Sequence, residues 1–149
     1  MKKILTTNSS NETMELGLRF SEVLNRGATV TLTGDLGAGK TTLVRGLAKG
    51  LGIKEVVQSP TFNIMKVYLK TDKPLIHIDA YRLADINDDI GLDEYIGYES
   101  GITVIEWPMF IENLIPENAI NVNIVHKGED KREITITSEE EIELWSQSI

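Results

Sequence analysis

The feature that most constrains this chain is the octapeptide GDLGAGKT at residues 34–41. It satisfies the pattern G-x-x-x-x-G-K-[ST] at all four fixed positions. A β-rich run over residues 28–33 precedes it, and apolar residues at helical spacing over residues 41–51 follow it. This context indicates a strand–loop–helix unit, which is typical of an α/β fold.

Glycines in such a loop let the backbone curl, so that several N–H groups point inward toward an anion. The helix N-terminus adds unpaired N–H groups and a partial positive charge. Lys40 is expected to reach the β- and γ-phosphates of a nucleotide, and the Thr41 hydroxyl to bind Mg²⁺. We find no N-K-x-D or D-x-x-G motif in a usable position, and ATP is therefore favoured over GTP.

The remaining pattern predicts one α/β domain over residues 1–149, with a mostly parallel central sheet flanked by helices and an antiparallel C-terminal hairpin. A capping box over Ser9–Glu12 opens a first helix that stops before Gly27. The hairpin strands are expected at the edge of the sheet. The other expected elements are strands at 56–57, 62–69, 75–78 and 102–105, a short helix at 108–114, hairpin strands at 119–126 and around 134–136, and a last helix beginning near 138.

Two acidic residues each follow a short apolar run: Asp79 ends PLIHID and Glu106 ends GITVIE. If both runs are parallel strands, both carboxylates lie at the carboxyl edge, where α/β sheets bind ligands. One would hold Mg²⁺ and the other would orient the attacking water, and spacing alone does not say which. Each could instead be a helix cap or a surface acid. His77 would share a strand face with Asp79 and could support that acid, or could be a partly buried strand histidine.

A stiff loop is expected at Ser59-Pro60-Thr61, because Pro60 fixes its own φ and biases Ser59 toward extended geometry. The loop would present the Thr61 hydroxyl between the first helix after the glycine loop and the first acid. A plain connection is the alternative.

Composition limits the partners. The chain has 15 Lys and Arg against 23 Asp and Glu, a net charge of −8, which makes unaided nucleic-acid binding less favourable. Cysteine is absent, which excludes thiolate chemistry. We see neither an apolar run long enough to cross a bilayer nor a signal peptide, and expect a cytoplasmic protein without a membrane partner.

Four blocks in this order resemble the TsaE (YjeE) family, and the resemblance extends from the first helix to the C-terminal hairpin. The blocks are GDLGAGKTT at 34–42, SPTF at 59–62, HIDAYRL at 77–83 and EWP at 106–108. The resemblance implies a P-loop ATPase needed for N6-threonylcarbamoyladenosine (t6A) at position 37 of ANN-decoding tRNAs. It implies partners of the TsaD and TsaB families, with tRNA bound through the complex and ATP hydrolysis resetting it between turnovers.

The resemblance also implies roles for individual residues. Thr41 and Glu106 would bind Mg²⁺, Asp79 would lie near the γ-phosphate or the water shell of the metal, and Thr61 would be a switch threonine. Lys40, Asp79, Glu106 and Thr61 would be catalytic. ATP would be bound by Gly34, Asp35, Leu36, Gly37, Ala38, Gly39, Lys40, Thr41, Thr42, Trp107 and Arg132.

The hairpin turn departs from the family pattern. A basic stretch is expected there, whereas Gly128 is followed by Glu129, Asp130, Lys131 and Arg132. Two other functions remain open. One is a small-molecule P-loop kinase, with Arg82 as its candidate phosphate-binding arginine. The other is an adaptor that binds nucleotide to present a partner surface without obligatory hydrolysis.

Overall fold

The structure, a computed structural model, describes residues 1–35, 37–55, 57, 64–69, 71–81, 83 and 91–139. Strands and helices alternate through the first part of the chain, and a hairpin closes it. The elements in chain order are β1 (Lys2–Thr7), α1 (Ser10–Val23), β2 (Thr29–Thr33), α2 (Lys40–Gly50), β3 (Met65–Tyr68), β4 (Leu75–Asp79), the 3-10 helix η2 (Leu92–Glu94), β5 (Ile102–Glu106), the 3-10 helix η3 (Pro108–Leu114), β6 (Ile120–His126) and β7 (Arg132–Thr137).

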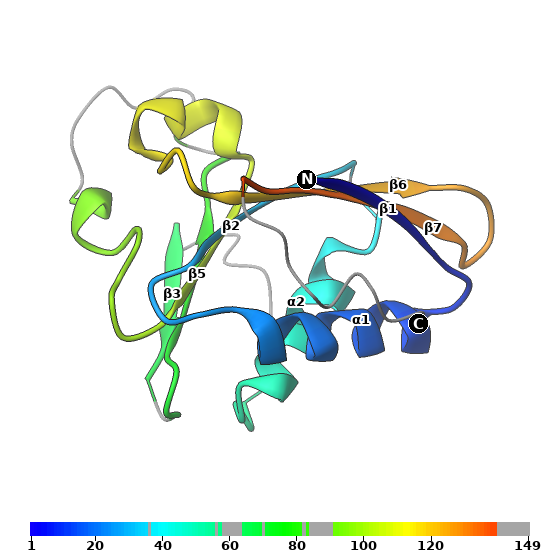
Figure 1. The fold of residues 1–149 in the computed structure, drawn as a ribbon, viewed down its shortest axis with the longest axis horizontal. Helices are drawn as coiled ribbons and strands as arrows, with labels where there is room; N and C mark the ends of the chain where they lie inside the picture. The colour runs from blue at the N-terminus through cyan, green and yellow to red at the C-terminus, as the bar shows by residue number, and fades with distance from the viewer. Residues whose placement is uncertain are drawn as a thin grey trace.

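The strands form one seven-stranded sheet in the order β1-β7-β6-β2-β5-β4-β3 (Figure 1). Strand β2, which precedes the glycine loop, is central and pairs in parallel with both β5 and β6. Strand β4 pairs in parallel with β5. The parallel core and the antiparallel hairpin of β6 and β7 confirm the predicted fold class.

The predicted edge of the sheet is wrong. No strand was identified at residues 2–7 from the sequence, yet β1 pairs antiparallel with β7 along its whole length. The hairpin is therefore interior, with β6 against β2 and β7 covered by β1. Strand β1 lacks a clear alternation of apolar and polar residues, because Ile4 is 57% exposed whereas the polar Thr7 at the end of the strand is fully buried.

Helices α1 and α2 lie side by side on one face of the sheet (Figure 1). Leu16 and Phe20 of α1 and Leu43 and Leu47 of α2 join the inward side chains of β2, β6 and β7 in the larger apolar core. Helix α2 packs on this face, and its first residue, Lys40, directly follows the loop that leaves β2. The packing thus fixes the helix N-terminus relative to the strand ends.

The start of α1 confirms the predicted capping box. The Ser9 hydroxyl accepts a hydrogen bond from the Glu12 N–H, at 3.1 Å. The Glu12 carboxylate accepts one from the N–H of Asn8, one residue before the cap. The helix ends at Val23, and Gly27 follows in a turn with φ +90°.

A smaller apolar core lies on the opposite face of β4 and β5. Ile76 and Ile78 of β4 and Ile105 of β5 pack there with residues of the two 3-10 helices, Leu92 and Ile111. This packing fixes η3 directly after the carboxyl end of β5. In the described part of the chain, no helix combines the length and apolarity that a bilayer crossing requires.

Several element boundaries differ from those predicted. The strand expected over 62–69 extends only over Met65–Tyr68 in the described residues, and Val57 is not in a strand. The short helix expected over 108–114 is present as η3. The last predicted helix lies outside the described residues beyond Glu139.

Candidate functional site

The glycine loop joins the carboxyl end of β2 to the first residue of α2, Lys40. Gly39 is the N-cap of α2, with φ +107°, in the left-handed region where a Cβ atom is disfavoured. No side chain caps this helix, and its first turn carries no acid. The N–H groups of the first turn are therefore not claimed by a cap, and the positive end of the helix is open to an anion.

Arg132, the first residue of β7, packs its side chain against this loop. A Cβ atom on Gly39 would lie 3.2 Å from Arg132 Nε and 3.6 Å from its Cδ. The guanidinium Nη1 donates to the carbonyl oxygens of Glu129 and Lys131, at 3.1 and 3.2 Å. The hairpin thus places a positive charge beside the glycine loop, where the resemblance had implied a role for Arg132.

The two predicted acids lie on neighbouring strands. Glu106 ends β5, and in the sheet register it lies between Leu32 of β2 and Asp79 of β4. Glu106 is only 3% exposed, whereas Asp79 is half-buried. The Asp79 carboxylate accepts a hydrogen bond from the Tyr81 N–H at 3.0 Å. The expected placement of both acids at one sheet edge is therefore correct.

Glu106 is the centre of a buried polar chain. Its Oε1 lies 4.0 Å from Lys40 Nζ, and its Oε2 lies 2.7 Å from His77 Nε2. Lys40 and His77 are 7% and 0% exposed. Neither alternative for His77 describes it fully: the side chain is completely buried, and although His77 and Asp79 share a strand face, its hydrogen bond is to Glu106 on the next strand.

Trp107 lies between the buried chain and the surface. It has φ +58° and ψ +52°, a left-handed conformation that costs a non-glycine residue about 1–2 kcal/mol. In this position its ring centroid lies 4.3 Å from Lys40 Nζ and 5.1 Å from the ring of Tyr81. The family resemblance implied that Trp107 lies near the nucleotide site, but a positive φ at a tryptophan has no sequence signal.

A pocket of about 530 Å³ adjoins the glycine loop on the β6 side. Polar groups and apolar side chains both line it, which suits a flat polar ligand with a hydrophobic face. The residues that β6 contributes were not predicted from the sequence. They reach the pocket because β6 pairs in parallel with β2, so that the carboxyl ends of both strands lie at the same edge of the sheet. The lining residues are Gly34, Asp35, Ala38, Trp107, Met109, Asn123, Ile124, Val125 and His126.

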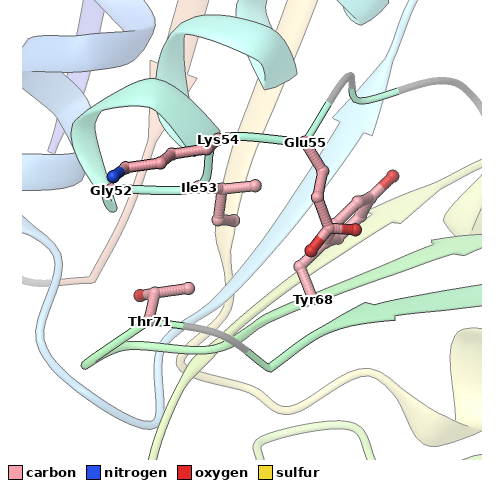
Figure 2. A pocket seen from close by; sticks show the side chains of 6 residues that line it. All are labelled: Gly52, Ile53, Lys54, Glu55, Tyr68 and Thr71. Atoms are coloured by element: carbon pink, nitrogen blue, oxygen red, sulfur yellow. The ribbon is translucent and has the colours of Figure 1, made fainter.

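A second pocket, of about 380 Å³, lies at the far end of α2 from the glycine loop. Figure 2 shows Glu55 and Tyr68 on one side of it and Thr71 below the turn that ends the helix. None of the predicted site residues lines this pocket. Of these two pockets among the described residues, only the loop pocket is lined by predicted site residues, namely Gly34, Asp35, Ala38 and Trp107.

Some predicted residues cannot be placed. Leu36, Thr61 with its neighbours Ser59 and Pro60, and Arg82 lie outside the described residues. Thr41 and Thr42 follow Lys40 in the first turn of α2.

Mg²⁺ prefers oxygen ligands, and it usually takes one or two from the protein while keeping water and phosphate oxygens. Glu106 offers a carboxylate and Thr41 a hydroxyl. Among the described residues, no group of three or more His, Cys, Asp or Glu could hold a metal ion. The residues therefore fit a metal bound jointly with a phosphate and do not form an all-protein metal site.

The fold and the site together define a class: a mixed α/β protein whose central strand leads through a glycine loop into a helix, beside buried Lys and Glu. Residues 7–134 match the family described as threonylcarbamoyl adenosine biosynthesis protein TsaE. The chain belongs to the TsaE family.

Curated relatives and a solved structure agree with this assignment. A relative from Bacillus subtilis (strain 168), named tRNA threonylcarbamoyladenosine biosynthesis protein TsaE, is 42% identical over 89% of this chain and 83% of its own. A relative of the same name from Treponema pallidum (strain Nichols) is 39% identical over 87% and 96%. The crystal structure of Bacillus subtilis YdiB superposes with a TM-score of 0.78 at 36% identity, covering 93% of this chain and 86% of that one.

Proposed function

We propose that this protein takes part in t6A biosynthesis on tRNA as a Mg²⁺-dependent ATPase. The observation that carries the proposal is the meeting of Lys40 and Glu106, 4.0 Å apart and buried, at the mouth of an uncapped glycine loop. A helix N-terminus and a lysine bind phosphate, and a carboxylate on the adjacent strand binds the accompanying cation. The names of the family and of its curated relatives supply the pathway.

The glycine loop and the first turn of α2 would bind the phosphates. No side chain caps the N-terminus of α2 at Gly39, and Lys40 would turn from Glu106 and Trp107 toward the β- and γ-phosphates. Arg132 would add a second positive charge from the hairpin, because its side chain already packs on Gly39. Two cations around one polyphosphate compensate its charge.

Glu106 and Asp79 would divide the remaining work. Thr41 and Glu106 would hold Mg²⁺, which when bound neutralises charge on the phosphate oxygens. Asp79, half-buried at the next strand end, would orient the attacking water. Thr61 would contact the γ-phosphate from its loop.

The nucleoside would occupy the loop pocket. The aromatic and apolar side chains of Trp107, Met109 and Val125 offer a surface for a base, and Asn123 offers an amide. No guanine-reading N-K-x-D motif is found, so we propose ATP as the nucleotide.

Partners would supply the transfer chemistry and most of the tRNA contacts. The net charge of −8 opposes RNA binding by this chain alone. We propose that it acts in the cytoplasm on proteins of the TsaD and TsaB families, and that hydrolysis resets their complex between turnovers.

The proposal is tested by reconstitution. The purified protein should hydrolyse ATP slowly, with an absolute requirement for Mg²⁺, and multiple-turnover t6A formation by TsaD and TsaB should need both this protein and ATP. A non-hydrolysable ATP analogue should not support repeated turnover. Repeated turnover with the analogue would contradict the role of hydrolysis and favour an adaptor.

A further inference from the structure

The structure assigns His77 as the positioning residue for Glu106. This inference rests on the proposed function and names a residue that acts on the metal site through another. His77 lies in the middle of β4, and Glu106 ends β5. Their side chains meet on the face of the sheet that faces the glycine loop and α2.

The contact is buried and short. His77 Nε2 lies 2.7 Å from Glu106 Oε2, and the two side chains are 0% and 4% exposed. A carboxylate that holds Mg²⁺ only accepts hydrogen bonds, so in the proposed role of Glu106 the donor would be Nε2. A charge-assisted hydrogen bond in a water-poor environment is among the stronger side-chain interactions.

The bond decides how Glu106 presents its second oxygen. With Oε2 held by His77, Oε1 is directed to the side where Lys40 Nζ lies, at 4.0 Å. At this distance Lys40 and Glu106 form an ion pair but no hydrogen bond. Oε1 is thus the oxygen left available when the lysine turns to phosphate.

The rest of His77 has no other polar role. Its Nδ1 is buried and has no hydrogen-bond partner in the described structure. A histidine kept only for packing would be replaceable by leucine. An orphaned ring nitrogen is a cost, and the Glu106 bond is the interaction that offsets it.

Replacing His77 is expected to lower the affinity for the metal and to leave the affinity for the nucleotide unchanged. Residues that orient metal ligands change metal affinity about 10- to 100-fold when they are replaced. We expect His77→Leu to weaken Mn²⁺ binding to the protein–ATP-analogue complex by about that factor, measured by electron paramagnetic resonance. Affinity for the analogue without metal should stay within about twofold.

Conservative variants separate positioning from packing. Gln places its amide N–H near the position of Nε2, whereas the shorter Asn matches Nδ1, which has no partner here. His77→Gln should therefore keep most of the Mn²⁺ affinity, and His77→Asn should lose it. This pair also remains informative if His77→Leu does not fold.

A control removes a different buried polar atom. Tyr68 is 1% exposed, lines the pocket at the far end of α2, and has a hydroxyl with no hydrogen-bond partner in the described structure. Tyr68→Phe should leave Mn²⁺ binding unchanged.

The outcomes distinguish a failure of the positioning role of His77 from a failure of the proposed function. If the wild-type protein binds Mn²⁺ with the analogue but His77→Leu binds it equally well, the positioning role is overturned. Equal losses in the Gln and Asn variants would overturn it too, since packing alone would then explain them. A wild-type protein that binds neither analogue nor Mn²⁺ would overturn the proposed function itself.

Discussion

At the scale of single residues, the site is organised around one buried ammonium group. Lys40 Nζ contacts the carboxylate of Glu106 and the ring face of Trp107, and its side chain is 7% exposed. Both contacts compensate for water that the ammonium has lost. Neither of these two contacts is a hydrogen bond, so they hold the lysine in place without using its N–H donors, which a phosphate could then take.

Replacing Glu106 by Gln should separate binding from hydrolysis. The amide retains an oxygen that can accept the hydrogen bond from His77, but it lacks the charge that would hold Mg²⁺. ATP hydrolysis should fall by about 100-fold or more, while the affinity for ATP without metal should stay similar or rise because a negative charge has gone. Steady-state ATPase assays and calorimetric titration measure the two quantities, and unchanged turnover would contradict the metal role of Glu106.

Replacing Lys40 by Ala should remove tight nucleotide binding. The lysine would contribute charged hydrogen bonds to the phosphates, each worth about 1.5–3 kcal/mol, so affinity should fall about 10- to 100-fold. Isothermal titration with ATP measures the change, and circular dichroism confirms that the variant is folded. Affinity within twofold of the wild type would show that the glycine loop binds nucleotide without its lysine.

Arg132 offers a third test with a neighbouring control. Its guanidinium packs on Gly39, whereas the side chain of Lys131 is exposed in the turn. Arg132→Ala should weaken ATP binding by about tenfold, and Lys131→Ala should have little effect. Equal effects would indicate only a general loss of positive charge.

At the scale of elements, the two long helices are held together by backbone contact. A Cβ atom on Gly46 of α2 would lie 2.0 Å from the carbonyl oxygen of Met14 in α1, and one on Gly17 of α1 would lie 2.3 Å from that of Leu43 in α2. The helices cross so closely that neither position has room for a methyl group. The crossing fixes where α2 begins, and hence where the glycine loop ends.

Gly46→Ala should therefore destabilise the fold despite the better helix propensity of alanine. The added methyl meets backbone, which cannot rotate away, and overpacking of this kind costs about 1–3 kcal/mol. Lys49→Ala, on the exposed side of the same helix, is the matched control. Urea unfolding followed by circular dichroism gives both values, and a Gly46 variant as stable as the control would mean that the helices can separate freely.

Local signals in the sequence were sufficient for elements whose cause is local. The Ser9 cap, the glycine loop, the helix after it and the strands before Asp79 and Glu106 all follow from short-range patterns, and the structure confirms them. The contact between His77 and Glu106 spans 29 residues and depends on which strands become neighbours. Spacing along one strand suggested Asp79 as the partner of His77, and only the register of β4 against β5 corrects that.

At the scale of the whole molecule, the order of strands decides which distant segments reach the loop. Because β6 runs parallel to β2, its carboxyl end lines the loop pocket, and the following turn returns Arg132 to Gly39. If the hairpin formed the edge of the sheet, as predicted, β6 would not lie beside β2 and these residues would not reach the loop. Non-local pairing of this kind leaves no short-range mark in a single sequence.

The outermost strand has a role in this arrangement that a deletion would reveal. Strand β1 covers β7, and in its register Thr7 lies opposite Arg132. Removing residues 1–6 would expose the edge of β7, take away the half-buried Leu5 and loosen the start of the strand that carries Arg132. We expect lower stability and a tendency to self-associate through the open edge.

The deletion should lower the urea midpoint clearly, and size-exclusion chromatography should show larger species at higher concentration. ATP affinity should fall no further than in Arg132→Ala, because β1 affects the loop only by supporting β7. Ile4→Thr is the control: Ile4 is 57% exposed, and its replacement should change the free energy of unfolding by no more than about 0.5 kcal/mol. If the deletion variant kept the wild-type urea midpoint, strand β1 would not be needed for stability, and the hairpin of β6 and β7 alone would hold Arg132 at the loop.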